Sequence, residues 1–263
     1  QIHYATGRRP AIVTSDLAVD SSREDRWTVT PSAPGDYALE ITEGAYSVET
    51  TIRAAAALVG APVKRVLFIG DSNTNRGGAG FVEHFGKALG AQVTLIGTRQ
   101  TSGYSFKHEG HDSFKWETFN SDTEVQGTVS PFWNPDTDAL DMAYFTELVN
   151  TTPNVVFIAL GQNDVYGSTD GTIAAACAAA LVQANVIHDA LVAAFPGVVI
   201  VYCLPPPGNG NPWRWDSESV RYQFRRNELA MGRALLEEFG DREAERIHVL
   251  GTSFQFDCVR GYV

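Results

Sequence analysis

Apolar and polar residues are spaced differently in the two parts of this chain. Up to about residue 60 they alternate, as in AIVTSDLAVD and RWTVTPSAPGDYALEITEGAYSVETTIRAA, and Pro-Gly-Asp and Glu-Gly supply turns. A period of two predicts half-buried β-strands. We therefore expect residues 1–60 to form a small β-rich accessory unit. The expected strand faces contain Val29, Tyr37, Leu39, Ile41, Tyr46, Val48 and Ile52.

Short apolar runs alternate with longer helical patterns from residue 63 onward. The runs predict strands at 66–69, 93–97, 155–160, 198–204 and 247–250. The longer patterns predict helices at 80–89, 142–150, 173–195 and 219–239, and a long loop is expected from about 98 to 138. Strands that alternate with helices favour an α/β fold, in which helices cover both faces of a parallel sheet.

Three polar or glycine-bearing segments directly follow predicted strands. They are GDSN at 70–73, GQND at 161–164 and PPPGNGNPWRW at 205–215. The ligand crevice of a parallel α/β sheet lies beyond the carboxyl ends of its strands. The three segments therefore predict a functional site at that edge.

Composition excludes several classes of function. The chain has 263 residues, 44% of them hydrophobic, which is enough for one large domain or for a large and a small one. A net charge of −11 argues against a nucleic-acid or anionic-membrane partner and suits a neutral or cationic substrate. No run of 18 apolar residues is present, so no membrane insertion is expected. The three cysteines form no C-x-x-C pair and no cluster with histidine, so no metal is expected.

Ser72 and Asn163 are the residues with the clearest candidate chemistry. A serine at this point is a nucleophile or the cap of the next helix. Asn163 follows a strand directly, where its amide is placed to donate to an oxyanion; the alternative is a turn residue that bonds its own backbone.

The two motifs together resemble the SGNH (GDSL-type) hydrolase family. IGDSNT, residues 69–74, is similar to the family's first block, with Ser72 as nucleophile, and GQND is similar to its third block, with Asn163 as oxyanion donor. HEGHDSFKWETF, residues 108–119, and SPFWNPDTDALDMAYF, residues 130–145, resemble the second-block region of carbohydrate-esterase-like members. The family usually has glycine where Ser113 stands, so the second backbone donor is Ser113 or Gly110.

The resemblance implies a flavodoxin-like three-layer α/β/α domain over residues 63–263. It further implies a serine esterase that works through an acyl-enzyme on Ser72, without a metal or organic cofactor. A catalytically inactive carbohydrate-binding or structural protein on the same fold and an O-acyltransferase are the alternatives.

The family takes its general base from a D-x-x-H block near the C-terminus, and no histidine of this chain has Asp three residues before it. Glu245-x-x-His248 is the nearest match, and His108 and His111 lie in the second block. We expect His84 and His188 to be helical surface or packing residues, and His3 is terminal. The catalytic Asp and His are expected beyond Val263, with an inactive protein and a rearranged base, such as His3 or a histidine of another chain, as alternatives.

Aromatic residues in the expected loops indicate a sugar or lipid platform, or ordinary packing. The predicted substrate-binding residues are Asp71, Asn73, Asp164, Trp116, Trp133, Tyr166 and Trp213. An acetyl ester on a carbohydrate is the preferred substrate, because no apolar lid or interfacial helix suggests a lipase. The accessory unit is expected to bind polysaccharide, form an oligomer contact or dock into a larger assembly, and a secreted, cell-surface or virion-associated setting is favoured over the cytoplasm.

Overall fold

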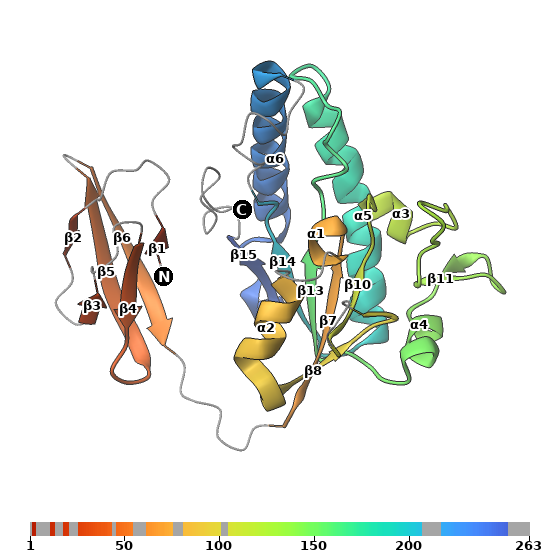
Figure 1. The fold of residues 1–263 in the computed structure, drawn as a ribbon, viewed down its shortest axis with the longest axis horizontal. Helices are drawn as coiled ribbons and strands as arrows, with labels where there is room; N and C mark the ends of the chain where they lie inside the picture. The colour runs from red at the N-terminus through yellow and green to blue at the C-terminus, as the bar shows by residue number, and fades with distance from the viewer. Residues whose placement is uncertain are drawn as a thin grey trace. The chain divides into compact units, whose positions relative to one another are not determined.

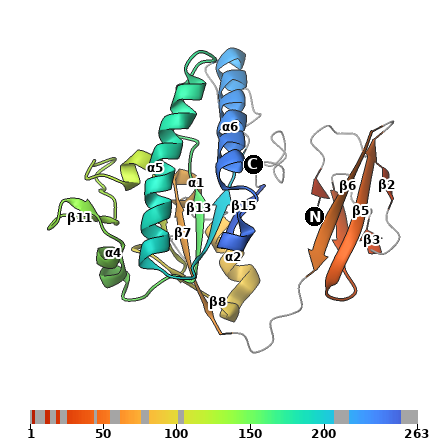
Figure 2. The same cartoon turned by 180° about the vertical axis from the view of Figure 1, so that it is seen from behind.

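The computed structural model describes residues 2–3, 11–13, 18–20, 26–43, 46–54, 62–75, 81–100, 105–206 and 217–251. Contacts divide the chain into two compact units, one within residues 1–61 and one within Pro62–Ser253. Each unit is described by itself. Figures 1 and 2 show the chain from opposite sides.

The described part of the first unit consists of antiparallel strands. They are β1 (Ile2–His3), β2 (Ala11–Val13), β3 (Ala18–Asp20), β4 (Arg26–Thr30), β5 (Gly35–Glu43) and β6 (Tyr46–Ala54). They form two three-stranded sheets, in the orders β1-β4-β3 and β2-β5-β6. The longest pairing joins β5 to β6, from Gly35 opposite Ala54 to Glu43 opposite Tyr46.

A seven-stranded sheet forms the centre of the second unit. Its strands are β7 (Lys64–Gly70), β8 (Val93–Ile96), β9 (Arg99–Gln100), β10 (Lys107–Gly110), β13 (Val155–Ala159), β14 (Val199–Cys203) and β15 (Ile247–Leu250). The order is β15-β14-β13-β7-β10-β9, and β8 also pairs with β7. All pairings are parallel except that of β9 with β10. The order β8-β7-β13-β14-β15 is the 2-1-3-4-5 order of flavodoxin-like folds.

Helices cover both faces of this sheet. The helices are α1 (Ser72–Asn75), α2 (Phe81–Leu89), α3 (Trp116–Phe119), α4 (Met142–Val149), α5 (Ile173–Ala194) and α6 (Glu218–Phe239). In Figure 1, α2 lies in front of the sheet, whereas in Figure 2, α5 and α6 lie in front. A short hairpin of β11 (Trp133–Asn134) and β12 (Ala139–Leu140) lies near α4. The second unit is therefore α/β, as the sequence predicts.

Successive residues of β7 belong to two different hydrophobic cores. Leu67 and Ile69 pack in the large core with residues of α5 and α6, whereas Val66 and Phe68 pack in the smaller core with Val82 of α2. Because side chains alternate across a strand, a strand covered on both faces is apolar at every position. This explains why β7 appears in the sequence as a continuous apolar run.

Helix α5 is long and apolar enough, by length and composition, to cross a bilayer, with a mean hydropathy of 1.5. The core helix of a globular domain passes the same test. Six of its side chains are buried in the second unit: Cys177, Ala180, Ala184, Ile187, His188 and Leu191.

The prediction that residues from about 98 to 138 form one long loop is wrong in part. This range contains β9, β10, α3 and β11, and β10 is a strand of the central sheet. Residues Lys107, His108 and Glu109 give this strand no apolar pattern, although His108 and Glu109 are fully buried. The strand escaped prediction because its buried side chains are polar and are satisfied by hydrogen bonds rather than by apolar packing.

Candidate active site

The three sequence blocks meet at neighbouring strands. The first block follows β7, the second begins on β10 and the third follows β13, and β7 lies between the other two strands. The chain leaves β7 towards β8 on one side and returns to β13 on the other, so this is the point where the strand order reverses. Ligand crevices of open α/β sheets lie at such points.

Ser72 is the first residue of α1, and Asp71 caps the helix. Asp71 Oδ1 accepts the N–H of Asn73 at 2.8 Å, and the carbonyl of Asp71 accepts the N–H groups of Thr74 and Asn75 at 3.1 and 3.0 Å. An aspartate before a helix fills the capping role in this way. The Ser72 hydroxyl and N–H have no hydrogen-bond partner among the residues that the structure describes. The alternative of Ser72 as the helix cap is therefore wrong.

Two glycines let α1 lie directly against the strand ends. A Cβ on Gly70 would lie 2.0 Å from Thr74 Oγ1, and one on Gly110 would lie 2.6 Å from the backbone N of Asn75. Neither distance is possible for a real side chain. The His111 N–H donates to the Gly70 carbonyl at 2.9 Å, which joins the second block to the end of β7.

Hydrogen bonding distinguishes the two candidate backbone oxyanion donors of the second block, Gly110 and Ser113. The Gly110 N–H donates to His108 Nδ1 at 2.9 Å, so this donor is occupied. The Ser113 N–H has no partner within the described residues. Ser113 has φ 66°, the left-handed conformation in which glycine is favoured. This conformation fits the family's usual glycine at that position, and the free N–H favours Ser113 over Gly110.

Asn163 has a fixed amide orientation. Its Nδ2 donates to the Phe114 carbonyl at 2.9 Å. A carbonyl only accepts, so the amide nitrogen must be the atom on that side. One N–H of this nitrogen is thereby used, and the other remains for a ligand.

Side-chain hydrogen bonds link all three blocks to one another. Asn73 Nδ2 donates to Gln162 Oε1 at 2.6 Å, which joins α1 to the third block. Asn75 Nδ2 donates to Asp112 Oδ1 at 2.9 Å, which joins α1 to the second. The Trp116 N–H donates to Asp164 Oδ1 at 3.2 Å, which adds to the Asn163–Phe114 bond between the second and third blocks. Hydrogen bonds therefore join each of the three blocks to the other two.

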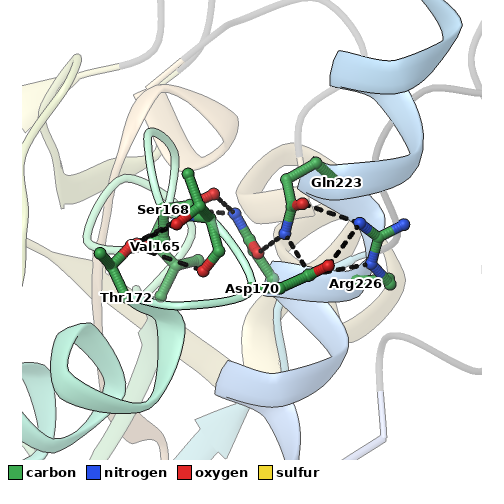
Figure 3. A network of polar contacts seen from close by, with 8 residues as sticks. Val165, Ser168, Asp170, Thr172, Gln223 and Arg226 are labelled. Carbon is green, nitrogen blue, oxygen red and sulfur yellow. Dashed lines mark hydrogen bonds and ion pairs between the residues drawn. The ribbon is translucent and has the colours of Figure 1, made fainter.

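Helix α6 anchors the segment that follows the third block (Figure 3). Asn227 Nδ2 donates to the carbonyls of Val165 and Ser168 at 3.0 and 2.7 Å. Figure 3 shows Gln223 and Arg226 of α6 reaching Asp170, with a Gln223 Nε2 to Asp170 Oδ1 distance of 2.9 Å. Asn227 is almost fully buried, so its two bonds hold this loop from inside the protein.

Burial disfavours the ionised form of the Asp164 carboxyl. Burial raises the pKa of its carboxyl to about 6; the Trp116 N–H and Lys115 oppose the shift, and Asp71 adds to it. Asp164 Oδ2 is buried without a hydrogen-bond partner. Asp71 is itself buried as a helix cap. Asp71 therefore has a structural role beneath the site, whereas Asp164 is half-buried and its assignment to substrate binding stays a prediction.

The second-block histidines are engaged away from Ser72. Burial, then the charges of Arg99 and His111, lowers the pKa of His108 to about 4, and its Nδ1 holds the Gly110 N–H. His111 Nε2 lies 3.0 Å from Glu109 Oε2, and its Nδ1 lies 3.5 Å from an Arg99 nitrogen. Glu109 also accepts from the N–H and hydroxyl of Thr98. None of the histidine side chains that the structure describes forms a hydrogen bond with Ser72 Oγ.

The other histidines also have different surroundings. His188 is buried on α5, where its Nδ1 lies 2.9 Å from the hydroxyl of Tyr202. His248 is exposed in the middle of β15, opposite Val201, and Glu245 pairs with Arg242 instead. The Glu245-x-x-His248 match is therefore not a charge pair.

The predicted aromatic platform is only partly at the surface. Trp116 is fully buried in the large core, so its assignment to substrate binding is wrong. Tyr166 is 62% exposed and packs edge-on against Phe224, Trp133 is half-buried, and Asn73 is exposed on α1. Trp213 lies outside the described residues. Within those residues, no group of three His, Cys, Asp or Glu side chains is arranged to hold a metal ion.

Sequence reasoning missed Glu109, Arg99 and Asn227, which support the site from beneath. Only the alternation of His and Glu in HEGH signalled a polar cluster, and its hydrogen-bond partners lie on another segment, Arg99 in β9 and Thr98 directly before it.

No family model matches the sequence, and no curated protein matches it. The chain is similar in fold to solved structures of esterases and acylhydrolases. A family 3 carbohydrate esterase from Clostridium thermocellum is 15% identical, with a TM-score of 0.45 over 73% of this chain and 79% of that one. A family 3 carbohydrate esterase from Talaromyces cellulolyticus is 16% identical (TM-score 0.42; 68% and 75%), and the lipase/acylhydrolase from Enterococcus faecalis is 14% identical (TM-score 0.41; 76% and 81%). These enzymes are of the kind that the resemblance to SGNH hydrolases implies.

Proposed function

We propose that this chain is a serine esterase that cleaves short acyl esters, in particular acetyl esters carried by a carbohydrate. The observation that carries the proposal is the set of hydrogen bonds that join the three sequence blocks around Ser72. Hydrogen bonds join α1 to Gln162 and Asp112, and join Asn163 to Phe114. A free serine hydroxyl is thereby grouped with an oriented amide and with backbone N–H groups that have no described partner.

The proposed reaction follows from these groups. Ser72 Oγ attacks the acyl carbon, and the carbonyl oxygen becomes an oxyanion that accepts from the N–H groups of Ser72 and Ser113 and from Asn163 Nδ2. A general base takes the Ser72 proton and passes it to the alcohol, which leaves as its bond to the acyl carbon breaks, so the acyl group stays on Ser72 as an ester. Water then attacks this ester through the same base, the acid is released, and the proton returns to Ser72 Oγ. The bond to Phe114 already orients the Asn163 amide before substrate binds, so little reorganisation is needed when charge develops.

A second candidate is a glycan-binding protein without turnover. Transfer of the Ser72 proton requires a general base, and no described histidine side chain contacts Oγ. This observation favours the inactive alternative as much as it favours a base supplied from elsewhere. The two candidates differ in whether Ser72 reacts.

The test is covalent labelling of Ser72 with a fluorophosphonate probe, followed by mass spectrometry and peptide mapping. We expect one adduct on Ser72, no adduct in Ser72→Ala, and an unchanged adduct in the control Ser121→Ala, whose serine lies outside the three blocks. Acetate release from acetylated xylan should depend on Ser72 in the same way.

Imidazole added to the labelling reaction distinguishes a missing general base from a missing nucleophile site. A labelling rate that rises with imidazole would show that Ser72 and the oxyanion donors are in place while the base is missing. A wild-type protein that gives neither adduct nor acetate, with or without imidazole, would refute the esterase and leave the binding protein.

A further inference from the structure

A polar pocket lies beside the second block. It is lined by side chains from α1, β9, the second block and the turn after α3: Asn75, Arg99, His111, Asp112, Gln126 and Thr128. Two apolar side chains, Phe114 and Val125, complete its wall. None of these residues belongs to the substrate-binding set predicted from the sequence.

Arg99 brings an unmatched cation to this pocket. Its one polar contact among the described side chains is with His111 Nδ1, at 3.5 Å. Arginine only donates, so His111 accepts there and directs its Nε2–H to Glu109. Glu109 in turn is occupied by Thr98 and His111 and does not reach Arg99. Most of the five guanidinium N–H donors of Arg99 are therefore left for a ligand.

Asp112 brings an anion to the same pocket, and this anion has no cationic partner among the residues that the structure describes. Its Oδ1 accepts from Asn75 at 2.9 Å, and its Oδ2 has no partner in the described structure. No ion pair joins Asp112 to Arg99, although both line the pocket. Asp112 is held by its hydrogen bond to Asn75, and Arg99 is held by its contact with His111.

The remaining polar atoms add both donors and acceptors. Gln126 Nε2 donates to Ser113 Oγ at 3.0 Å, which leaves Gln126 Oε1 as an acceptor. The Thr128 hydroxyl has no partner within the described residues and is able to donate or accept. The pocket therefore presents a cation, an anion, an amide oxygen and a hydroxyl within one small space.

This mixture selects a chemical class of ligand. A simple anion satisfies Arg99 but is repelled by Asp112, and an apolar chain leaves every one of these groups unpaired at a cost. A ring with adjacent hydroxyls, each a donor and an acceptor, satisfies both charges at once.

We propose that the polar pocket binds a neutral sugar ring through Arg99, Asp112, Gln126 and Thr128. The Gln126–Ser113 bond places this ring next to the proposed oxyanion donor. If the proposed function holds, the pocket is a subsite for a sugar of the glycan substrate next to the acylated one; only this placement as a subsite depends on that function.

Binding is measured by calorimetry on the Ser72→Ala protein, so that hydrolysis plays no part. The probes are xylotriose as a neutral sugar and trigalacturonic acid as an acidic one. We expect Arg99→Gln and Asp112→Asn each to weaken xylotriose binding about tenfold or more, because each removes a charged hydrogen-bond partner. Thr128→Val should weaken it by less, and the exposed control Asp122→Asn should leave it unchanged.

Several outcomes would overturn the assignment. The first is the absence of xylotriose binding, and the second is equal binding of xylotriose by all variants. The third is binding of trigalacturonic acid alone, which Arg99→Gln abolishes and Asp112→Asn strengthens. This third outcome would make the pocket an anion site. Thr128→Val guards against misfolding, because it removes only a hydroxyl from the wall. Sugar binding that depends on Arg99 and Asp112, in a protein whose Ser72 gives neither adduct nor acetate with or without imidazole, would support the pocket and refute the esterase.

Discussion

Replacing Asp164 by asparagine changes the charge beneath the site without changing its shape. The asparagine Oδ1 still accepts the Trp116 N–H, which lies 3.2 Å from the aspartate oxygen. What disappears is the negative charge on a carboxyl whose second oxygen is buried without a partner. The expected effect is on the pH dependence of stability.

The magnitude follows from the two pKa values of Asp164. Burial raises the pKa from 3.8 to about 6 in the folded protein. Below pH 3.8 the carboxyl is protonated in both states and costs nothing. As the pH rises towards 6 and beyond, the unfolded chain ionises more readily, so the folded state loses stability. Two pKa units correspond to about 3 kcal/mol, most of it lost between pH 4 and 7.

Urea unfolding at pH 4.5, 6 and 7.5, followed by fluorescence, measures this effect. Asp164→Asn should be more stable than wild type by about 1 kcal/mol at pH 4.5 and by about 3 kcal/mol at pH 7.5. Asp122→Asn, at an exposed position, controls for the loss of one negative charge, and equal m-values show that the same transition is compared. A wild type and an Asp164→Asn variant with parallel pH profiles would refute the inference that burial disfavours this carboxylate.

Three further substitutions test how the site is built. Asn163→Ala should lower kcat about 10²–10³-fold with little change in folding, measured by acetate release; an unchanged kcat would remove Asn163 from the oxyanion hole. Ser113→Gly should keep kcat within about threefold, because the donor is a backbone N–H and glycine accepts φ 66°; a large loss would show that the side chain itself acts. Asn227→Leu leaves the carbonyls of Val165 and Ser168 unpaired and should reduce the free energy of unfolding by about 2–4 kcal/mol, far more than Gln223→Ala. Equal losses in these two helix α6 variants would contradict the anchoring role of Asn227.

The central part of the fold was predictable because its strands are covered on both faces. Such strands read as continuous apolar runs, and β7, β13 and β14 all lie where the sequence predicts them. Strand β10 was not predictable by the same reasoning. Its buried His108 and Glu109 are stabilised by hydrogen bonds to Gly110, Thr98 and His111, which a periodicity of apolar residues does not register.

The residues of the site were predictable only where a motif follows a strand. Ser72 and Asn163 were singled out in this way, and the structure brings their blocks together. The roles of Asp71 and Trp116 were not predictable, because an acidic or aromatic residue beside a catalytic motif serves the ligand or the fold equally well. Both side chains are buried, which assigns them to the fold rather than to ligand binding.

The bracing of the site does not depend on a histidine. Among the described residues, the hydrogen bonds that join the Ser72 helix to the second and third blocks, and Asn163 to Phe114, are made by backbone groups or by amide and carboxylate side chains. In serine hydrolases, oxyanion donors and binding alone retain part of the rate enhancement when a catalytic residue is removed. The proposed oxyanion donors are therefore positioned without a histidine side chain, and imidazole tests the supply of the base separately. A response to imidazole and a dependence on Asn163 together would show that the proposed nucleophile and oxyanion hole are functional parts of one site.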